Sequence, residues 1–233
     1  MNANIATLNQ LPETEAFSRW LEIPGEWVEE PNVRRGGTSG VKRIRSDKGQ
    51  MLYRKQQSGH IFRSLRHPFG YPTVMREREA LLACDALNVI VPALVFAACR
   101  KEQGQWQALL VTEALEGFKS LEDCYAEQLQ LVWGEALQLE ILREFGRALG
   151  RLNRGRWQHG CLRLKHVFVR VDGAKPEVAL LDLEKSRQRL LASRASGHDL
   201  RQVKNRLPMT ASQWAAFLEG YRSTYGNALP KGI

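Results

Sequence analysis

The sequence has few cysteines, and none of them belongs to a C-x-x-C pair. The four thiols stand in apolar or helix-like surroundings at Cys84, Cys99, Cys124 and Cys161. A disulfide framework or a zinc knuckle needs closely spaced cysteines. This spacing therefore argues against both and predicts reduced thiols.

The chain also lacks any apolar run that approaches the ~18 residues of a membrane-spanning helix. It begins MNANIATLNQ, with no basic segment followed by an apolar one, so it does not resemble a signal peptide. Internal repeats and low-complexity segments are missing as well. From these absences we expect a cytoplasmic protein.

Acidic residues are outnumbered: 34 Lys and Arg against 25 Asp and Glu give a formal net charge of +9 over 233 residues. Such a charge suits nucleic acid, acidic lipid headgroups or phosphorylated sugars, and a solvated basic surface without a specific partner is the alternative. No recognised nucleic-acid-binding motif accompanies it, so nucleic acid is not an expected partner. The length suits one large domain or one bilobal domain.

Glycines cluster in the stretch RRGGTSGVKRI, at Gly36, Gly37 and Gly40. The pattern predicts a strand, a glycine turn and a second strand. Without Cβ atoms, such a turn lets backbone N–H groups approach phosphate oxygens, and an ordinary hairpin is the alternative. A second turn, SDKG, leads to the strand MLYRKQQ with Lys55, which is either a solvent-facing lysine or a phosphate ligand.

Helical spacing of apolar residues predicts two helices in this half of the chain, Pro12–Leu21 and one that begins at Thr73 as N-cap. The second carries Glu77 and Glu79 in its first turns. Either carboxylate could form an ion pair with Lys55, and we favour Glu77 over Glu79. The alternative is that both are surface charges.

A basic, aromatic segment, His60 to Pro72, precedes this helix. We interpret it as a packed connector in preference to a loop that meets an acceptor or a membrane. Two strands are expected after the helix, Ala93–Arg100 and Trp106–Leu115. The second ends in TEALEGF, which is either a hinge between lobes or the end of a plain hairpin, and Gly117 marks the expected boundary.

The C-terminal half is expected to be mainly helical. Apolar residues from Glu135 to Leu152 follow a strict helical spacing, with Asn153 and Gly155 as terminators. Gly197 is expected to break the chain before a basic helix over residues 198–206. A last helix over residues 210–225 has an aromatic core face.

Between these helices lies QHGCLRLKHVFVRVDGAKPEVALLDLEKSR, residues 158–187. It predicts a polar loop, a short strand over residues 167–169, a turn at Asp172-Gly173 and a second strand over residues 178–181 that ends on Asp182. A His-led loop and an Asp at the ends of two short strands are typical of the phosphate-handling part of protein kinase-like folds.

In order and spacing, these motifs resemble those of the lipopolysaccharide kinase family, in its InaA-like branch, which is related to the core heptose kinases. The resemblance covers roughly residues 34–207. It implies an α+β, bilobal protein kinase-like fold: an antiparallel-sheet N-lobe over residues 1–116 and a mainly helical C-lobe over residues 117–233.

The resemblance also implies roles for individual residues. ATP would be held by the glycine turn, by Lys55 paired with Glu77, and by the hinge at Glu113 and Leu115. Mg²⁺, or Mn²⁺, would be held by Asp182 and His166. His159 would be a scaffold residue, and Asp199 a buried carboxylate that fixes the catalytic-loop backbone. The candidate catalytic residues are Cys161, Arg163, Lys165 and Asp182.

One departure from the kinase pattern concerns the catalytic loop, which reads His-x-Asp with an Asn five residues after the Asp. Here those two positions carry Cys161 and His166. A thiol with a pKa of about 8.5 is mostly protonated at neutral pH and orients a hydroxyl poorly. Imidazole is a worse Mg²⁺ ligand than the Asn amide oxygen, although Mn²⁺ tolerates it better.

Two functions follow. The first is an ATP-dependent phosphotransferase acting on a sugar hydroxyl of lipopolysaccharide core or a related envelope glycolipid, with basic segments 60–66 and 185–206 contacting the anionic acceptor. Its expected place is the cytoplasm, with peripheral contact at the cytoplasmic face of the inner membrane. The second is a nucleotide-binding pseudokinase with a regulatory or stress-response role, for which Cys161 is the evidence.

Overall fold

The computed structural model describes residues 4–34, 36–173 and 175–230. They form two compact units. The first comprises the chain up to Glu79 together with Pro92–Ala114, and the second comprises Ala80–Val91 together with the chain from Leu115 onward. The assignment of residues 1–116 and 117–233 to two kinase lobes stays a prediction.

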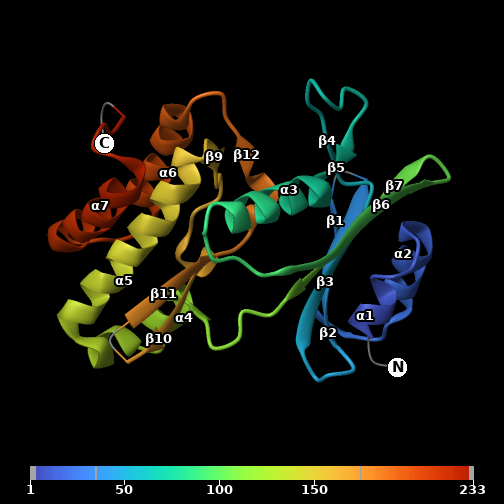
Figure 1. Cartoon of the computed structure of the whole chain (residues 1–233), viewed down its shortest axis with the longest axis horizontal. Coiled ribbons are helices and arrows are strands. Elements are labelled where there is room, and N and C mark those ends of the chain that lie inside the picture. The colour runs from blue at the N-terminus through green and yellow to red at the C-terminus, as the bar shows by residue number, and fades with distance from the viewer. Residues whose placement is uncertain (1–3, 35, 174, 231–233) are drawn as a thin grey trace. The chain divides into compact units, whose positions relative to one another are not determined.

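The first unit is built on an antiparallel sheet with the strand order β1-β2-β3-β7-β6 (Figure 1). A two-stranded hairpin, β4 with β5, extends from it. Helices α1, α2 and the first half of α3 accompany these strands, and α3 from Ala80 onward belongs to the second unit. The bounds are α1 Ile5–Leu8, α2 Glu13–Glu22, β1 Glu26–Arg34, β2 Gly37–Arg45, β3 Met51–Ser58, β4 Ile61–Phe62, β5 Tyr71–Pro72, α3 Thr73–Ala86, β6 Leu94–Glu102 and β7 Gln105–Glu113.

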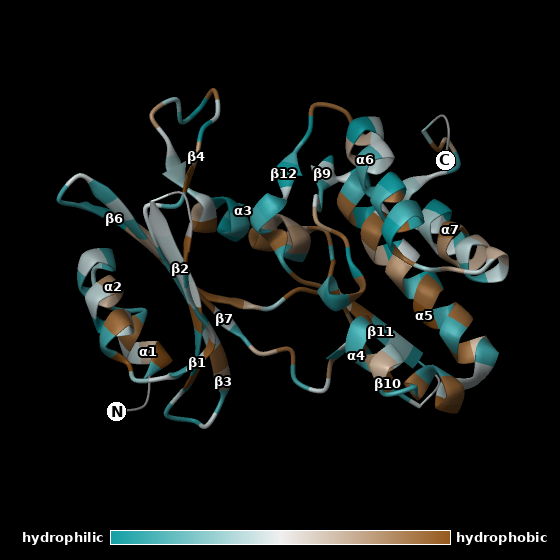
Figure 2. Ribbon diagram, turned by 180° about the vertical axis from the view of Figure 1, so that it is seen from behind, coloured by the Kyte–Doolittle hydropathy of each residue, from teal (hydrophilic) through white to brown (hydrophobic). Residues whose placement is uncertain are grey.

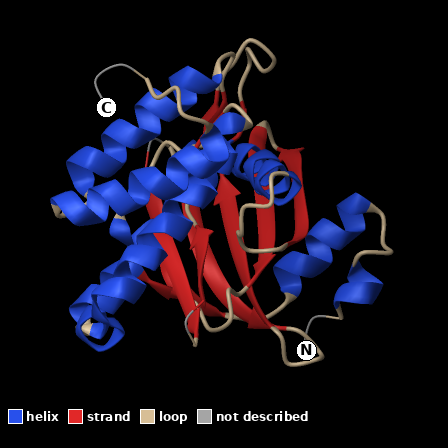
Figure 3. Ribbon diagram, turned by 60° about the vertical axis from the view of Figure 1, so that its left-hand side comes forward, coloured by secondary structure: helices blue, strands red, loops and turns tan. Residues whose placement is uncertain are grey.

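Strand β3 shows how the two faces of this sheet are used, because its side chains alternate between them. Leu52 belongs to the apolar core under α2, and buried Arg54 donates through Nη1 to the carbonyl oxygens of Trp20 and Ile23 at the end of α2. A cation there complements the helix dipole. Figures 1 and 3 show α1 and α2 on one face of the sheet.

The opposite face of β3 holds α3. The Gln57 side-chain oxygen accepts from the hydroxyl of Thr73 (2.8 Å) and from the N–H of Val74 (3.2 Å). The first turn of α3 is therefore capped from the sheet. Thr73 is the first helical residue, so its prediction as N-cap is wrong.

The predicted glycine turn is shorter than expected. Arg34 pairs with Gly37, and Gly36, with φ of +76°, lies between them. Residue 35 lies outside the described residues. Gly37 and Gly40 lie in β2, and their placement in the turn is wrong. A Cβ on Gly37 would lie 2.6 Å from the carbonyl oxygen of Ser58, so glycine is needed there for strand approach.

The second unit is mainly helical (Figure 3). Its small sheets have the strand orders β11-β10-β8 and β12-β9, all antiparallel. The bounds are β8 Lys119–Ser120, α4 Leu121–Ala126, α5 Leu129–Arg154, β9 Trp157–Gln158, η1 Leu164–His166, β10 Val167–Asp172, β11 Lys175–Leu180, η2 Leu183–Lys185, β12 Arg187–Gln188, α6 Ala192–Arg206 and α7 Ala211–Tyr225.

Helix α5 is the core of this unit, and Figure 2 shows hydrophobic and hydrophilic residues alternating along it. Its buried apolar residues lie between Ile141 and Leu152, whereas Leu131 and Val132 near its start are exposed. It starts earlier than the predicted Glu135, at Leu129, and is interrupted at Gly134, whose φ and ψ are 70° and 169°. The regular part thus begins at the predicted residue. It ends at Arg154 with Gly155 as C-cap. The prediction of Asn153 as a terminator is wrong, because that residue is buried inside the helix.

Gly197 was expected to break the chain, and this prediction is wrong as well. It lies buried in the interior of α6. Tertiary packing of the helix outweighs the roughly 1 kcal/mol by which glycine weakens a helix relative to alanine. The prediction of an antiparallel N-terminal sheet and a mainly helical C-terminal part is confirmed. Among the described residues, no helix is long and apolar enough to cross a membrane.

Candidate functional site

The stretch 158–187 contains the predicted loop and two strands, and the strands extend further toward the turn between them than expected. The second strand ends at Leu180, two residues before the predicted Asp182. The loop 159–163 follows β9, the short helix η1 leads into β10, and β11 returns antiparallel to it. The pairing of Val167 with Leu180 brings the start of β10 beside the end of β11. Leu181 then donates its N–H to the carbonyl oxygen of His166 (2.9 Å). The register therefore places Asp182 next to the loop.

A buried carboxylate anchors this loop from α6. Asp199 is completely buried and accepts from the backbone N–H groups of His159 (2.7 Å) and Gly160 (3.1 Å). The expectation that Asp199 fixes the loop backbone is confirmed. The His159 ring is fully buried beside the loop, and desolvation lowers its pKa, so it suits the scaffold role implied for it.

Two further residues of this anchor were missed by the sequence analysis. The Asn153 amide donates to Asp199 (2.8 Å) and to the carbonyl oxygen of Trp157 (2.9 Å). Gln202 accepts from the N–H of Leu162 (2.8 Å) and donates to the carbonyl oxygen of Gly160 (3.0 Å). The spacing Asp199-x-x-Gln202, on one face of a helix, was a signal that could have identified Gln202.

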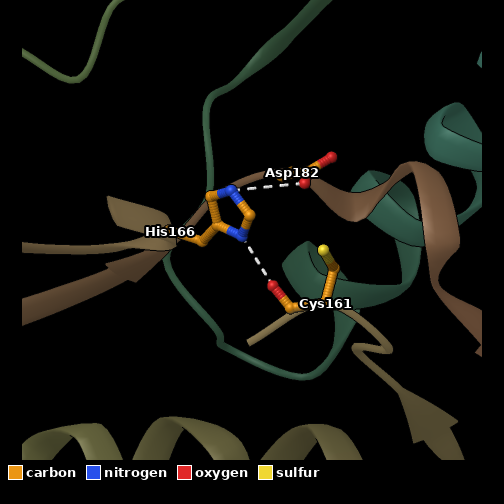
Figure 4. A group of neighbouring side chains, drawn as sticks. All are labelled: Cys161, His166 and Asp182. Atoms are coloured by element: carbon orange, nitrogen blue, oxygen red, sulfur yellow. Dashed lines mark hydrogen bonds and ion pairs between the residues drawn. The ribbon is translucent and has the colours of Figure 1, made fainter. Parts of the chain in front are cut away.

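Cys161, His166 and Asp182 point toward one another at the end of the loop (Figure 4). One donor atom from each lies within 4.8 Å of the others. Nε2 of His166 lies 3.3 Å from Oδ2 of Asp182. The structure thus brings three predicted site residues into one cluster, which we call the Cys-His-Asp cluster.

The orientation of the His166 ring follows from its other nitrogen. Nδ1 is hydrogen-bonded to the carbonyl oxygen of Cys161. A carbonyl oxygen can only accept, so Nδ1 carries the proton. In the neutral ring Nε2 then carries a lone pair, which faces a carboxylate oxygen of Asp182. A cation, either a proton or a metal ion, is needed between these two acceptors.

Asp182 has an unusual backbone for a residue with a side chain. Its φ and ψ are both 59°, in the left-handed region. Such conformations cost roughly 1 kcal/mol or more and concentrate at functional sites. The hydrogen bond from Leu181 to His166 on one side, and the turn of η2 on the other, hold it there.

Burial raises the pKa of the Cys161 thiol, and the charge of Asp182 raises it further. Lys185 and Arg163 act in the opposite direction. The thiol is therefore a poor general base at neutral pH. Arg163 and Lys165 are both exposed on the loop and on η1, where their charges remain accessible to an anion.

In the first unit, Lys55 and Glu77 form an ion pair. Nζ of Lys55 on β3 lies 2.8 Å from Oε2 of Glu77 on α3. Their side chains are only 18% and 13% exposed, which strengthens the attraction relative to a surface pair. Of the two carboxylates considered, Glu79 is exposed. The structure therefore brings Lys55 together with the favoured candidate.

The remaining predicted nucleotide-binding residues lie at the end of β7. Glu113 is its last residue, and its N–H donates to the carbonyl oxygen of Ala93 (2.9 Å). Ala114 donates to Met51 (2.9 Å). Leu115 follows and accepts from the N–H of Phe118 (3.2 Å). The backbone N–H groups of Glu113 and Ala114 are thus already hydrogen-bonded within the fold.

The Cys-His-Asp cluster does not fit Mg²⁺, the ion that kinase-like folds imply. Mg²⁺ demands octahedral oxygen coordination and is held by carboxylates, phosphates and water. Here Asp182 alone supplies oxygen, beside an imidazole nitrogen and a thiol. Mn²⁺ accepts imidazole more readily than Mg²⁺ does.

Comparison with known proteins agrees with this geometry. Residues 18–221 match the model of the "Lipopolysaccharide kinase (Kdo/WaaP) family". "Protein InaA" of Escherichia coli (strain K12) is 39% identical over 201 residues, which cover 86% of this chain and 92% of that protein. The solved structure "WaaP in complex with acyl carrier protein" superposes with a TM-score of 0.71, at 17% identity, over 96% of this chain and 88% of that one. The fold is therefore protein kinase-like.

Proposed function

Because this chain belongs to the lipopolysaccharide kinase (Kdo/WaaP) family, we propose that it is an ATP-dependent phosphotransferase acting on a sugar hydroxyl of lipopolysaccharide core or a related envelope glycolipid. The observation that carries the proposal is the Lys55–Glu77 ion pair. A carboxylate on a helix that holds an ammonium on the third strand of a sheet is the arrangement with which kinases bind the α- and β-phosphates.

In this proposal the protein acts by positioning charge. Lys55 neutralises the nucleotide phosphates, and the β1–β2 hairpin, with Gly36, Gly37 and Gly40, supplies backbone near them. Glu113 and Leu115 are the candidate contacts of the adenine. Phosphoryl transfer depends mainly on positioning and charge neutralisation, which Arg163 and Lys165 support at the γ-phosphate. Because the cluster does not fit Mg²⁺, no step is assigned to that ion.

We place the acceptor contact at the hairpin loop between β4 and β5. In this loop Leu65 and Phe69 are 104% and 93% exposed, and Arg63 and Arg66 are exposed as well. The preference for a packed connector is wrong for this loop. Apolar and basic side chains together suit the acyl chains and phosphates of an acidic lipid surface. The basic segment 185–206 is the second candidate contact.

Vesicle sedimentation tests this contact. We expect the protein to sediment with vesicles containing anionic lipid and not with neutral ones. Replacing both Leu65 and Phe69 by Ser should abolish sedimentation, whereas Leu131→Ser, at another exposed leucine, should not. Equal sedimentation of the two variants would contradict the placement at this loop.

Cys161 supports a second function, that of a nucleotide-binding pseudokinase with a regulatory role. Its thiol stands where kinases carry the catalytic Asp, and burial keeps it protonated. A positioned base contributes roughly 10²- to 10⁴-fold in rate, so its loss leaves a weak enzyme or none.

Two measurements separate these functions. A thermal-shift titration with ATP and Mg²⁺ or Mn²⁺ tests the nucleotide site, because ligand binding to the native state raises Tm by mass action. ATP consumption with a glycolipid extract, compared with Asp182→Ala, then tests transfer. A shift without turnover above Asp182→Ala favours the pseudokinase. No shift contradicts both.

A further inference from the structure

We infer that the Cys-His-Asp cluster is a binding site for a thiophilic divalent transition metal of the Zn²⁺ class, with Cys161 as a direct ligand. The inference names the ion of the site discussed above and rests on the proposed phosphotransferase function only for the ion's role. One carboxylate, one imidazole and one thiol converge here, at a position where kinases use oxygen donors alone.

The distances within the cluster suit coordination by one ion. Zn²⁺ is bound at ~2.0–2.2 Å by imidazole nitrogen and carboxylate oxygen, so two such ligands of a tetrahedral ion lie ~3.3–3.5 Å apart. Nε2 of His166 and Oδ2 of Asp182 are 3.3 Å apart. The Cys161 sulfur completes a set of three donors within 4.8 Å. Three protein ligands leave a fourth position for water or a phosphate oxygen, as in catalytic zinc sites.

The imidazole is oriented for this role by the same residue that supplies the sulfur. The hydrogen bond from Nδ1 to the Cys161 carbonyl oxygen fixes the tautomer, so that the Nε2 lone pair faces the cluster. Metal-ligating histidines commonly donate their other N–H to a carbonyl or carboxylate, which holds the ring and raises its basicity. His166 thus has the outer contact expected of a ligand.

Charge and ligand type determine the class of ion. On coordination the Cys161 thiol gives up its proton to solvent, and the thiolate together with the Asp182 carboxylate balances a divalent charge. Sulfur and imidazole donors favour Zn²⁺ and Co²⁺ over Mn²⁺, and Mn²⁺ over Mg²⁺. A metal held by this cluster would supply electrostatic stabilisation of a bound phosphate without the carboxylate that kinases place at position 161.

The test uses Co²⁺ as a spectroscopic probe on the full-length protein without nucleotide. Binding through Cys161 should give a sulfur-to-Co²⁺ charge-transfer band together with the d–d bands of a tetrahedral ion. Equimolar Zn²⁺ should abolish both, and excess Mg²⁺ should not. Absence of the charge-transfer band, or its loss on addition of Mg²⁺, would overturn the inference.

Matched variants assign the band to this cluster. Cys161→Ser, which removes only the sulfur donor, should abolish the charge-transfer band and weaken Zn²⁺ binding by ~10- to 100-fold in a chelator competition. His166→Gln should weaken it similarly. Cys99→Ser, at a half-buried thiol in the first unit, should keep both. If Cys161→Ser and Cys99→Ser bind Zn²⁺ alike, the inference is wrong. Circular dichroism establishes that each variant is folded.

Failure of this inference and failure of the proposed function are distinguishable. A Cys161-dependent band in a protein without ATP turnover upholds the metal site and contradicts the phosphotransferase. Turnover supported by Mg²⁺, with no sulfur-to-metal band, upholds the phosphotransferase and contradicts the metal site.

Discussion

The carboxylate of Asp199 accepts the backbone N–H of His159 at 2.7 Å, across 40 residues of sequence. The same carboxylate also accepts from Gly160 and from the side chain of Asn153. One buried residue on α6 thus holds the loop that carries Cys161 and leads into η1 with His166. The geometry of the Cys-His-Asp cluster depends on this anchor.

We therefore expect Asp199→Ala to be among the most destabilising substitutions in the second unit. It leaves two buried donors and one partly buried donor without their acceptor, and each costs about 1–3 kcal/mol. The predicted loss in the free energy of unfolding is at least ~3 kcal/mol, measured by urea denaturation. Exposed Asp172→Ala, in the β10–β11 hairpin, is the control and should change it by less than ~0.5 kcal/mol. Similar losses for the two variants would contradict the anchoring role.

Two buried glycines in helices should respond to alanine in opposite directions. A Cβ on Gly220 of α7 would collide with the carbonyl oxygen of Arg143 on α5, so Gly220→Ala should force the helices apart. We expect a loss of roughly 1–3 kcal/mol or more. At Gly197 the nearest atom to an added Cβ is in Pro230, at an ordinary 3.5 Å. Gly197→Ala should therefore stabilise α6 by about 0.5–1 kcal/mol.

Thermal denaturation of both variants beside the wild type checks this pair. Tm should fall for Gly220→Ala and rise for Gly197→Ala. A fall of Tm for both would mean that α6 tolerates no added methyl group, contrary to the space seen beside Gly197.

Alkaline pH should destabilise the protein, partly through Cys84. Burial raises the pKa of this thiol from 9.0 to about 12. Between these values the thiol is ionised in the unfolded chain and protonated in the folded one, so the unfolded state binds fewer protons. Stability then falls as pH rises, by up to ~1.4 kcal/mol per pH unit for this group.

The contribution of Cys84 is isolated by comparison with Cys84→Ala. In urea denaturation from about pH 8 to about pH 11, the free energy of unfolding should decline less steeply with pH for the variant. The difference should reach up to ~1.4 kcal/mol per pH unit, the contribution of one titrating group. The variant is expected to be less stable at neutral pH, because it leaves a small cavity. Parallel declines in the two proteins would show that Cys84 is not the group responsible.

Lys55 should matter for nucleotide binding beyond its effect on folding. We expect Lys55→Met to abolish the ATP-induced rise in Tm, measured from the variant's own melting point. The free energy of unfolding should also fall, by up to about 3–5 kcal/mol, because the variant removes one partner of a largely buried ion pair. Glu77→Gln should reduce the rise by less, since it displaces the ammonium without removing it. Lys48→Met, in the exposed β2–β3 turn, is the control and should keep the full shift. An undiminished shift in Lys55→Met would contradict the proposed nucleotide contact.

Periodicity and turn chemistry were sufficient to predict most of the helices and strands, and the kinase-like fold was implied by the family resemblance. The alternation in β3 and the helical spacing after Glu135 are local signals that packing reinforces, and both elements form as predicted. The failures have tertiary causes. Gly197 has no local helix preference, and the packing of α6 decides its conformation. Thr73 is an ordinary N-cap residue by sequence, and the cap comes instead from Gln57 on a distant strand.

For the candidate site, too, the sequence predicted some features, and others depend on tertiary contacts. The family resemblance implied that His166 and Asp182 lie together, and strand register brings them there because it fixes where β11 ends relative to η1. The resemblance could not predict Asn153 or the tautomer of His166, since each depends on contacts made only after folding. The unsuitability of the donor set for Mg²⁺ was visible in residue types. That the sulfur joins the set was visible only in the structure.

Cys161→Asp gives the sharpest prediction about chemistry. It restores the carboxylate that kinases use to orient the acceptor hydroxyl, and it replaces a sulfur donor by oxygen. We expect ATP turnover with glycolipid acceptor to rise by at least ~10²-fold, the lower range for a positioned base. Preference should also change from Zn²⁺ or Co²⁺ toward Mn²⁺ and Mg²⁺. Cys161→Asn, which has nearly the same shape and no basic oxygen, is the control and should show no gain in turnover. If Asp and Asn at this position are equally active, the thiol does not stand in place of a catalytic base, and the loop acts by positioning alone.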